Sequence, residues 1–100
     1  MNITTRIFEH LGGNTFTAMV RPSGMLAKGN KLAFRFPEGK DGINAVEYEL
    51  NGFSLYEVTY LRIENAQREV IKTDTMMHGD CLRMHFHLTT GIATKLEQKA

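Results

Sequence analysis

The sequence predicts an all-β or β-rich α+β fold, a small antiparallel β-barrel or sandwich of six to seven strands in one domain over 1–100. Apolar residues alternate with polar ones along four segments, and this period of two places each apolar set on one face of a strand. The polar partners indicate sheets with one face in water, as antiparallel sheets have. An Asn-Gly pair at 51–52 adds a tight hairpin. The alternating sets are Phe16, Ala18 and Val20; Leu32, Phe34 and Phe36; Val46, Tyr48 and Leu50; and Leu82, Met84, Phe86 and Leu88.

The first segment supports two interpretations. Ile3, Ile7 and Leu11 recur every four residues, which is typical of a helix, and Gly12-Gly13 would suit its C-terminal cap. A first β-strand over 3–11 is the alternative. We therefore expect either a short N-terminal helix or one more strand.

The middle of the chain predicts a hairpin followed by a long strand. Asn51-Gly52 favours the two positive φ values of a type I′ turn, which would pair Leu50 with Phe53 and Tyr48 with Leu55.

A strand over 53–63, a turn at 64–67 and a weaker strand over 68–77 follow, with a helix spanning 55–70 as the alternative. The tail over 94–100 predicts a frayed helical turn or a disordered end.

The charges are nearly balanced. Twelve Lys and Arg against eleven Asp and Glu give a formal net charge of +1, too little for a field that holds phosphate backbones or anionic lipid. Phe34, Phe36 and Phe86 alternate out of phase with the cations, so they would not stack beside them on bases. We expect no nucleic-acid partner and keep an oligonucleotide-binding barrel as the second alternative. Its cationic stripe would comprise Lys28, Lys31, Arg35, Arg83, His85 and His87.

Cysteine content and the N-terminal residues bear on the compartment. Cys81 is the single cysteine, so no disulfide forms within the chain. The start, MNITTRIFEHL, lacks the charged and apolar regions of a signal peptide. Apolar runs are far shorter than the roughly 20 residues of a membrane helix. We expect a cytoplasmic protein that does not enter membranes.

Three of the four histidines gather near the C-terminus. On a strand, His85 and His87 share one face and lie about 6.6 Å apart, a span from which two imidazoles can bind one metal ion. A third ligand would have to come from elsewhere, and His78 is a candidate. This arrangement makes a metal-dependent β-barrel protein or enzyme the first alternative function.

The same segment resembles a known motif. Gly79, five intervening residues, His85, one residue and His87 are similar to the opening of the first motif of the cupins, which are small β-barrels that hold metals. The resemblance covers nine residues. Gly91 or Ile92 stands where the motif continues with a glutamate.

No complete set of catalytic groups emerges from the sequence. Cys81 and His85 would lie about 13 Å apart on a strand, whereas a base must lie within about 3 Å of its nucleophile. We expect no catalytic residue and no cofactor. The favoured function is therefore a non-catalytic binding or assembly module that acts through protein–protein contacts.

The connection over 21–30 suits such contacts, because Met25 and Leu26 are adjacent apolar residues on a predicted loop. The partner would be another protein or a second copy of this chain, with a homo-oligomer expected. The connection over 37–44 predicts a charged link between two strands.

Overall fold

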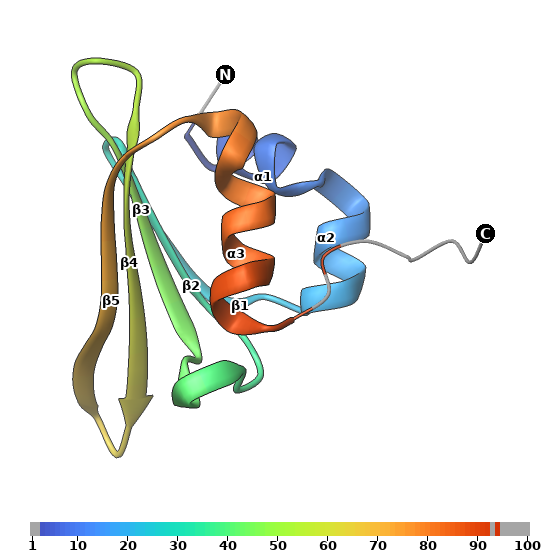
Figure 1. Ribbon diagram of the computed structural model, residues 1–100, viewed down its shortest axis with the longest axis vertical. Coiled ribbons are helices and arrows are strands. Elements are labelled where there is room, and N and C mark those ends of the chain that lie inside the picture. Colours follow the sequence, from blue (N-terminus) through green and yellow to red (C-terminus); the bar gives the residue numbers. More distant parts are fainter. Residues whose placement is uncertain (1–2, 93, 95–100) are drawn as a thin grey trace.

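A five-stranded antiparallel sheet, covered by helices on one face only, forms the protein (Figure 1). The computed structural model describes residues 3–92 and 94. The expectation for the tail falls on residues 95–100, which lie outside this range. The elements are α1 (Ile3–Leu11), α2 (Gly13–Val20), β1 (Ser23–Lys28), β2 (Lys31–Arg35), η1 (Lys40–Gly42), β3 (Ala45–Leu50), β4 (Tyr56–Glu64), β5 (Gln67–Met77), η2 (Gly79–Cys81) and α3 (Leu82–Thr90), where η marks a 3-10 turn.

The strands pair in sequence order, β1-β2-β3-β4-β5. This confirms the β-rich antiparallel class. The sheet is open, with edges at β1 and β5, so the described residues form neither a closed barrel nor a second sheet, and they hold five strands rather than six to seven. The difference arises because two segments expected as strands are helices.

The strand predicted over 82–88 is wrong, because this segment is α3. Leu82, Phe86 and Thr90 are buried at intervals of four, which is the spacing of one helix face. Positions 82 and 86 satisfy both a period of two and a period of four, so the pattern alone does not separate helix from strand. Gly91, at a φ of 73°, ends the helix and donates its N–H to the His87 carbonyl.

The segment 16–20 is also helical and belongs to α2. Its Phe16 and Val20 are buried in the core of the protein at a four-residue spacing, as residues on one face of a helix are. The helix alternative is confirmed for the N-terminus, where Ile7 and Leu11 of α1 are buried. Gly12 follows at a φ of 126° and donates its N–H to the Phe8 carbonyl.

The turn between β3 and β4 differs from the predicted type I′ hairpin. Leu50 pairs with Tyr56, so the connection holds five residues, and Gly52 has no positive φ. The Asn51 side-chain oxygen accepts hydrogen bonds from the N–H groups of Phe53 (2.8 Å) and Leu55 (3.2 Å). Asn51 therefore begins the turn, as asparagine commonly does when its side chain replaces a backbone acceptor.

The turn between β4 and β5 has the geometry that was expected at 51–52. Glu64 pairs with Gln67, and the two residues between them, Asn65 and Ala66, have φ values of 52° and 66°. Two positive φ values in a two-residue connection define a type I′ turn. The turn expected at 64–67 and the strand expected over 68–77 are confirmed. The strand expected over 53–63 is present as β4 but begins only at Tyr56, because residues 53–55 belong to the preceding turn, and the helix alternative over 55–70 is wrong.

The core lies between the sheet and the three helices. Phe86 of α3 packs edge-on against Phe16 and Phe36, with ring centroids 5.2 and 5.0 Å apart. The fully buried side chains of the core are Leu32, Phe34, Val46, Tyr48, Tyr56, Val58 and Tyr60 from the sheet, Ile43 before β3, and Ile7, Leu11, Phe16, Val20, Leu82 and Phe86 from the helices.

Candidate functional site

His85 and His87 do not share a face. Both lie on α3, where residues two apart point about 200° apart around the helix axis. His85 points to the sheet, whereas the His87 Nδ1 lies 3.0 Å from the Ile92 carbonyl oxygen and fixes the end of the helix. Among residues 3–92 and 94, no group of three or more His, Cys, Asp or Glu side chains is arranged to hold a metal ion. His78 is exposed and precedes η2.

A hydrogen-bonded chain joins α3 to the sheet through His85. The Tyr60 hydroxyl lies 2.8 Å from His85 Nδ1, and His85 Nε2 lies 2.7 Å from an Asp74 carboxylate oxygen. The Lys72 ammonium lies 3.6 Å from the same oxygen. Sequence analysis missed this chain because it requires β4, β5 and α3 to be adjacent.

The inner end of this chain is inaccessible. Tyr60 is fully buried, and burial raises the pKa of its hydroxyl, as does the nearby Asp74 carboxylate. Burial also raises the pKa of Tyr48, which lies next to Tyr60 without meeting the geometry of a hydrogen bond. A hydroxyl that no substrate can reach does not act as a nucleophile or acid. The hydrogen bonds from Tyr60 through His85 to Asp74 therefore hold α3 on the sheet.

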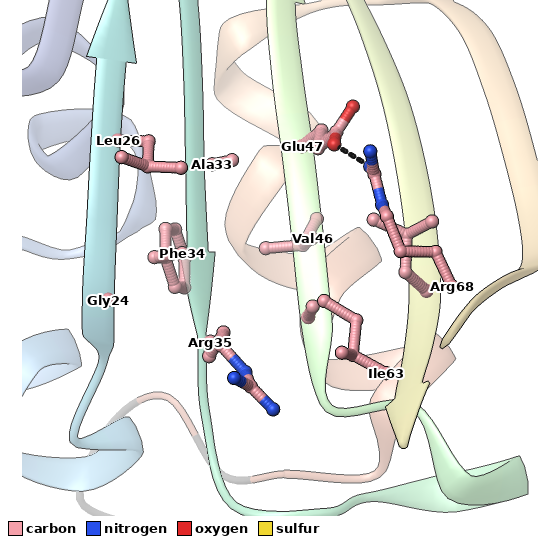
Figure 2. A pocket seen from close by; sticks show the side chains of 11 residues that line it. Gly24, Leu26, Ala33, Phe34, Arg35, Val46, Glu47, Ile63 and Arg68 are labelled. Atoms are coloured by element: carbon pink, nitrogen blue, oxygen red, sulfur yellow. Dashed lines mark hydrogen bonds and ion pairs between the residues drawn. The ribbon is translucent and has the colours of Figure 1, made fainter. Parts of the chain in front are cut away.

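A groove on the uncovered face of the sheet is the second feature. The helices lie on the opposite face (Figure 1). The groove has a volume of about 220 Å³ and runs across β1 to β5 (Figure 2). Leu26, Ala33, Ala45, Leu61 and Ile63 supply its apolar lining, and we call this surface the open-face groove.

The floor of the open-face groove is formed by Ala45 and Leu61, which pair across β3 and β4. Only 3% and 2% of their surfaces are exposed, although neither belongs to the core under the helices. The sequence carries a signal for this second buried face. Ala45 precedes Val46 and Leu61 follows Tyr60, so two adjacent apolar residues interrupt the alternation in each strand and face opposite sides.

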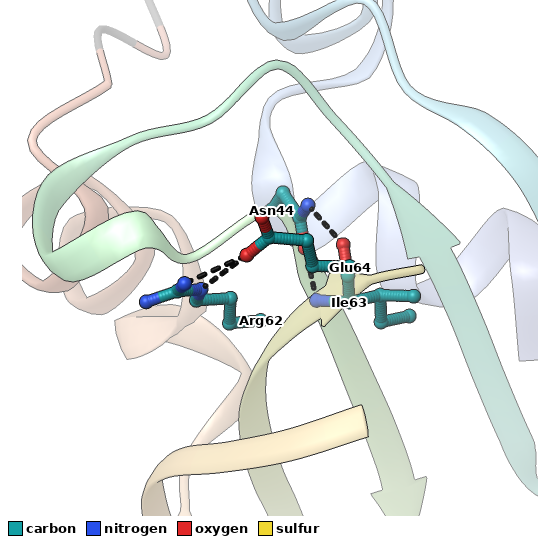
Figure 3. A network of polar contacts seen from close by, with 4 residues as sticks. All are labelled: Asn44, Arg62, Ile63 and Glu64. Carbon is teal, nitrogen blue, oxygen red and sulfur yellow. Dashed lines mark hydrogen bonds and ion pairs between the residues drawn. The ribbon is translucent and has the colours of Figure 1, made fainter. Parts of the chain in front are cut away.

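Asn44 fixes the backbone beneath the open-face groove. Its side-chain amide donates to the Ile63 carbonyl and its side-chain oxygen accepts the Ile63 N–H, both at 2.8 Å (Figure 3). Its own N–H donates to the Leu61 carbonyl at 3.0 Å. On the neighbouring residues, Arg62 and Glu64 form an ion pair at 2.7 Å. These bonds continue the β3–β4 ladder past its end and hold Leu61 and Ile63 in place.

The rim of the open-face groove carries more cations than anions. Glu47 forms an ion pair with Arg68, whose side chain extends from β5 (Figure 2). It forms a second ion pair with Lys31 at 3.7 Å. Arg35 also lines the groove, and within the described part of the chain it has no acidic partner. Glu47 thus pairs with two cations, and the Arg35 guanidinium adds a third positive charge on the same face.

The partner-binding candidates, Met25 and Leu26, lie on the edge strand β1 rather than on a loop. Both are exposed, and Leu26 has 73% of its surface in solvent at the wall of the open-face groove. The structure therefore brings Leu26 together with groove residues from β2, β3 and β4 that sequence analysis did not associate with it.

No protein-family model, curated protein or solved structure matches the chain. Within residues 3–92 and 94, none of the helices has the length and apolar character needed to cross a membrane.

Proposed function

We propose that this protein is a non-catalytic binding or assembly module that receives a protein segment in the open-face groove. The observation that carries the proposal is the apolar lining of a sheet face that none of the helices within residues 3–92 covers. A half-buried antiparallel sheet normally turns a polar face to water. Here that face carries Leu26, Ala33 and Ile63, whose exposed apolar surface a partner would remove from solvent above the buried floor of the groove, in the place where a sandwich has its second layer.

The size of the groove favours a protein side chain over a small molecule. Pockets that enclose metabolites or drug-sized ligands measure about 300–1,000 Å³ and bury most of the ligand. The open-face groove measures about 220 Å³ and is only partly enclosed. It suits one large apolar anchor of a protein, surrounded by charged residues at the rim.

The irregular pairing at both edges of the sheet favours its uncovered face, rather than an edge strand, as the contact surface. The pairing of β1 with β2 is interrupted by a bulge between Ser23 and Leu26. The pairing of β4 with β5 is interrupted at two points, and Met76 has a φ of 58°. Bulges and charged side chains are devices that prevent strand addition at an edge.

Selection of binding peptides from a displayed random library tests the proposal. Selected peptides should bind the parent chain and Leu88→Asp, and Leu26→Asp should lose at least tenfold in affinity. Leu88 is a matched control because it is 65% exposed on α3, on the helical side. Amide chemical shifts should move at Ala33 and Leu61. Peptides that bind Leu26→Asp equally well, or that shift only helix amides, would refute the open-face groove as the site.

A further inference from the structure

We infer that the segment received by the open-face groove is the β3–β4 turn of a second copy of this chain, with Phe53 as its anchor. This inference rests on the proposed function and names the partner. It follows from three features of the described residues: an exposed aromatic residue on a fixed turn, an acidic pair beside that turn, and a cationic rim around the groove.

Phe53 is the most exposed large apolar residue among those the structure describes, with 78% of its surface in solvent. Its turn is held in several ways. Asn51 accepts hydrogen bonds from the N–H groups of Phe53 and Leu55, and its own N–H donates to the Leu55 carbonyl at 2.8 Å. The Asn51 amide also lies 3.7 Å from the Met76 sulfur on β5. An aromatic side chain on a constrained turn loses little entropy on binding, and aromatic anchors dominate protein interfaces.

The strands beside this turn carry unpaired negative charge. Glu49 and Glu57 lie directly opposite each other on β3 and β4, an arrangement of like charges that destabilises a sheet. Within the described ranges neither has an ion pair. Lys31 is the cross-strand neighbour of Glu49, yet its ammonium pairs with Glu47. A cationic partner surface would therefore relieve this repulsion.

The open-face groove offers the complementary charge. Among residues 3–92 and 94, Arg35 at its rim lacks an acidic partner, and Arg68 and Lys31 share Glu47. Seating Phe53 in the groove would bring Glu49 and Glu57 of one copy toward Arg35 of another. Complementary charges around an apolar anchor set the orientation and speed of association.

The turn and the groove are different surfaces of the chain, so each contact joins two unlike surfaces. Two copies that exchange both contacts form a two-fold dimer, whereas a copy that uses its turn on one neighbour and its groove on the next generates rings or open chains. In either arrangement the contact can be tested by complementation. A variant with a defective turn and a variant with a defective groove can still form one complete contact, in which the intact turn of the second lies in the intact groove of the first.

Sedimentation velocity over about 1 µM to 1 mM protein tests this inference with three chains. The parent should increase in mean mass with concentration, and added salt should weaken the association. Phe53→Ser and Leu26→Asp should each remain monomeric alone, and an equimolar mixture of the two should form a 1:1 dimer. Leu88→Asp should behave as the parent does.

A mixture of Phe53→Ser and Leu26→Asp that stays monomeric would overturn the inference, as would a Phe53→Ser variant that assembles like the parent. A parent that is monomeric throughout would also overturn it. In that case the displayed peptides decide the proposed function separately, because peptide binding lost in Leu26→Asp would leave the groove as a site for another protein.

Discussion

Tyr60 and His85 are joined by a hydrogen bond of 2.8 Å between the tyrosine hydroxyl and the histidine Nδ1, across the interface of β4 and α3. His85 continues to Asp74 on β5 through its second ring nitrogen. One side chain thus connects two strands to the helix that packs over them. Because Tyr60 is fully buried, removal of His85 takes the hydrogen-bond partner away from a buried hydroxyl.

Replacement of His85 should therefore destabilise the protein. We expect His85→Ala to lower the free energy of unfolding by about 2 kcal/mol, since a buried hydroxyl left without its partner costs about 1–3 kcal/mol. Met84→Ala is the matched control, because Met84 is exposed on the preceding position of the same helix. Urea unfolding measures both. Equal stability of His85→Ala and the parent would show that the hydrogen-bonded chain contributes nothing.

Stability should fall in alkaline solution. Burial raises the pKa values of Tyr48, Tyr56 and Tyr60 above that of an unfolded tyrosine, so the folded state retains protons that the unfolded state loses. Their stabilisation is complete below about pH 10 and is lost as the pH rises further, by up to about 1.4 kcal/mol per pH unit for each tyrosine. Urea unfolding between about pH 8 and pH 11 measures the slope. Tyr60→Phe should reduce it, and an unchanged slope would contradict the assignment.

The β4–β5 turn should accept a stabilising glycine. Ala66 has a φ of 66°, in a region that costs an L-residue about 1 kcal/mol and costs glycine little. We expect Ala66→Gly to raise the free energy of unfolding by about 0.5–1 kcal/mol. Ala18→Gly, at an exposed position of α2, should instead destabilise by about 0.5–1 kcal/mol. Thermal unfolding of the pair gives the two signs, and a loss of stability in Ala66→Gly would exclude the type I′ geometry.

Two glycines should respond to alanine in opposite ways. A Cβ added at Gly39 would lie 2.5 Å from the backbone oxygen of Thr90, so Gly39→Ala must displace the end of α3 and should cost about 1–3 kcal/mol. At Gly52 a Cβ meets nothing within 4 Å, and its φ is not positive, so Gly52→Ala should be neutral or slightly stabilising. Denaturant unfolding compares them. A strongly destabilised Gly52→Ala would restore the hairpin that the Asn-Gly pair suggested.

The sequence predicts the sheet better than the helices. β2 and β3 follow from alternation, because a strand with one buried face has its apolar side chains at every second position. β5 follows from the turn residues at 64–67, since none of its side chains is fully buried. The segment containing Leu82 and Phe86 fits both a helical and a strand period, and the burial of Thr90 together with the exposure of Met84 and Leu88 identifies the helix. The sequence Asn51-Gly52 fits two turns, one in which both residues adopt positive φ values and one in which the Asn51 side chain accepts backbone hydrogen bonds. The structure has the second.

The candidate site was less predictable because it depends on register. The open-face groove exists where Ala33, Ala45 and Leu61, from three strands, come together on one face. A shift of one residue in any pairing would move its contributor to the helical side. Met25 and Leu26 were identified as adjacent apolar residues on a predicted loop, and their relation to the groove required β1 to be a strand at the sheet edge.

The strand order has a consequence for how the chain folds. Every strand pairs with its neighbour in sequence, so the ladders close short loops and should form early. The contact of α1 with η2 and α3 joins opposite ends of the chain instead, as where the His10 ring packs on Gly79. Because this contact closes a long loop, we expect it to form after the transition state for folding. His10→Ala should then raise the unfolding rate and leave the refolding rate nearly unchanged in stopped-flow measurements. The sheet would then present its uncovered face to the surrounding solution before the terminal helices have finished docking on the other side.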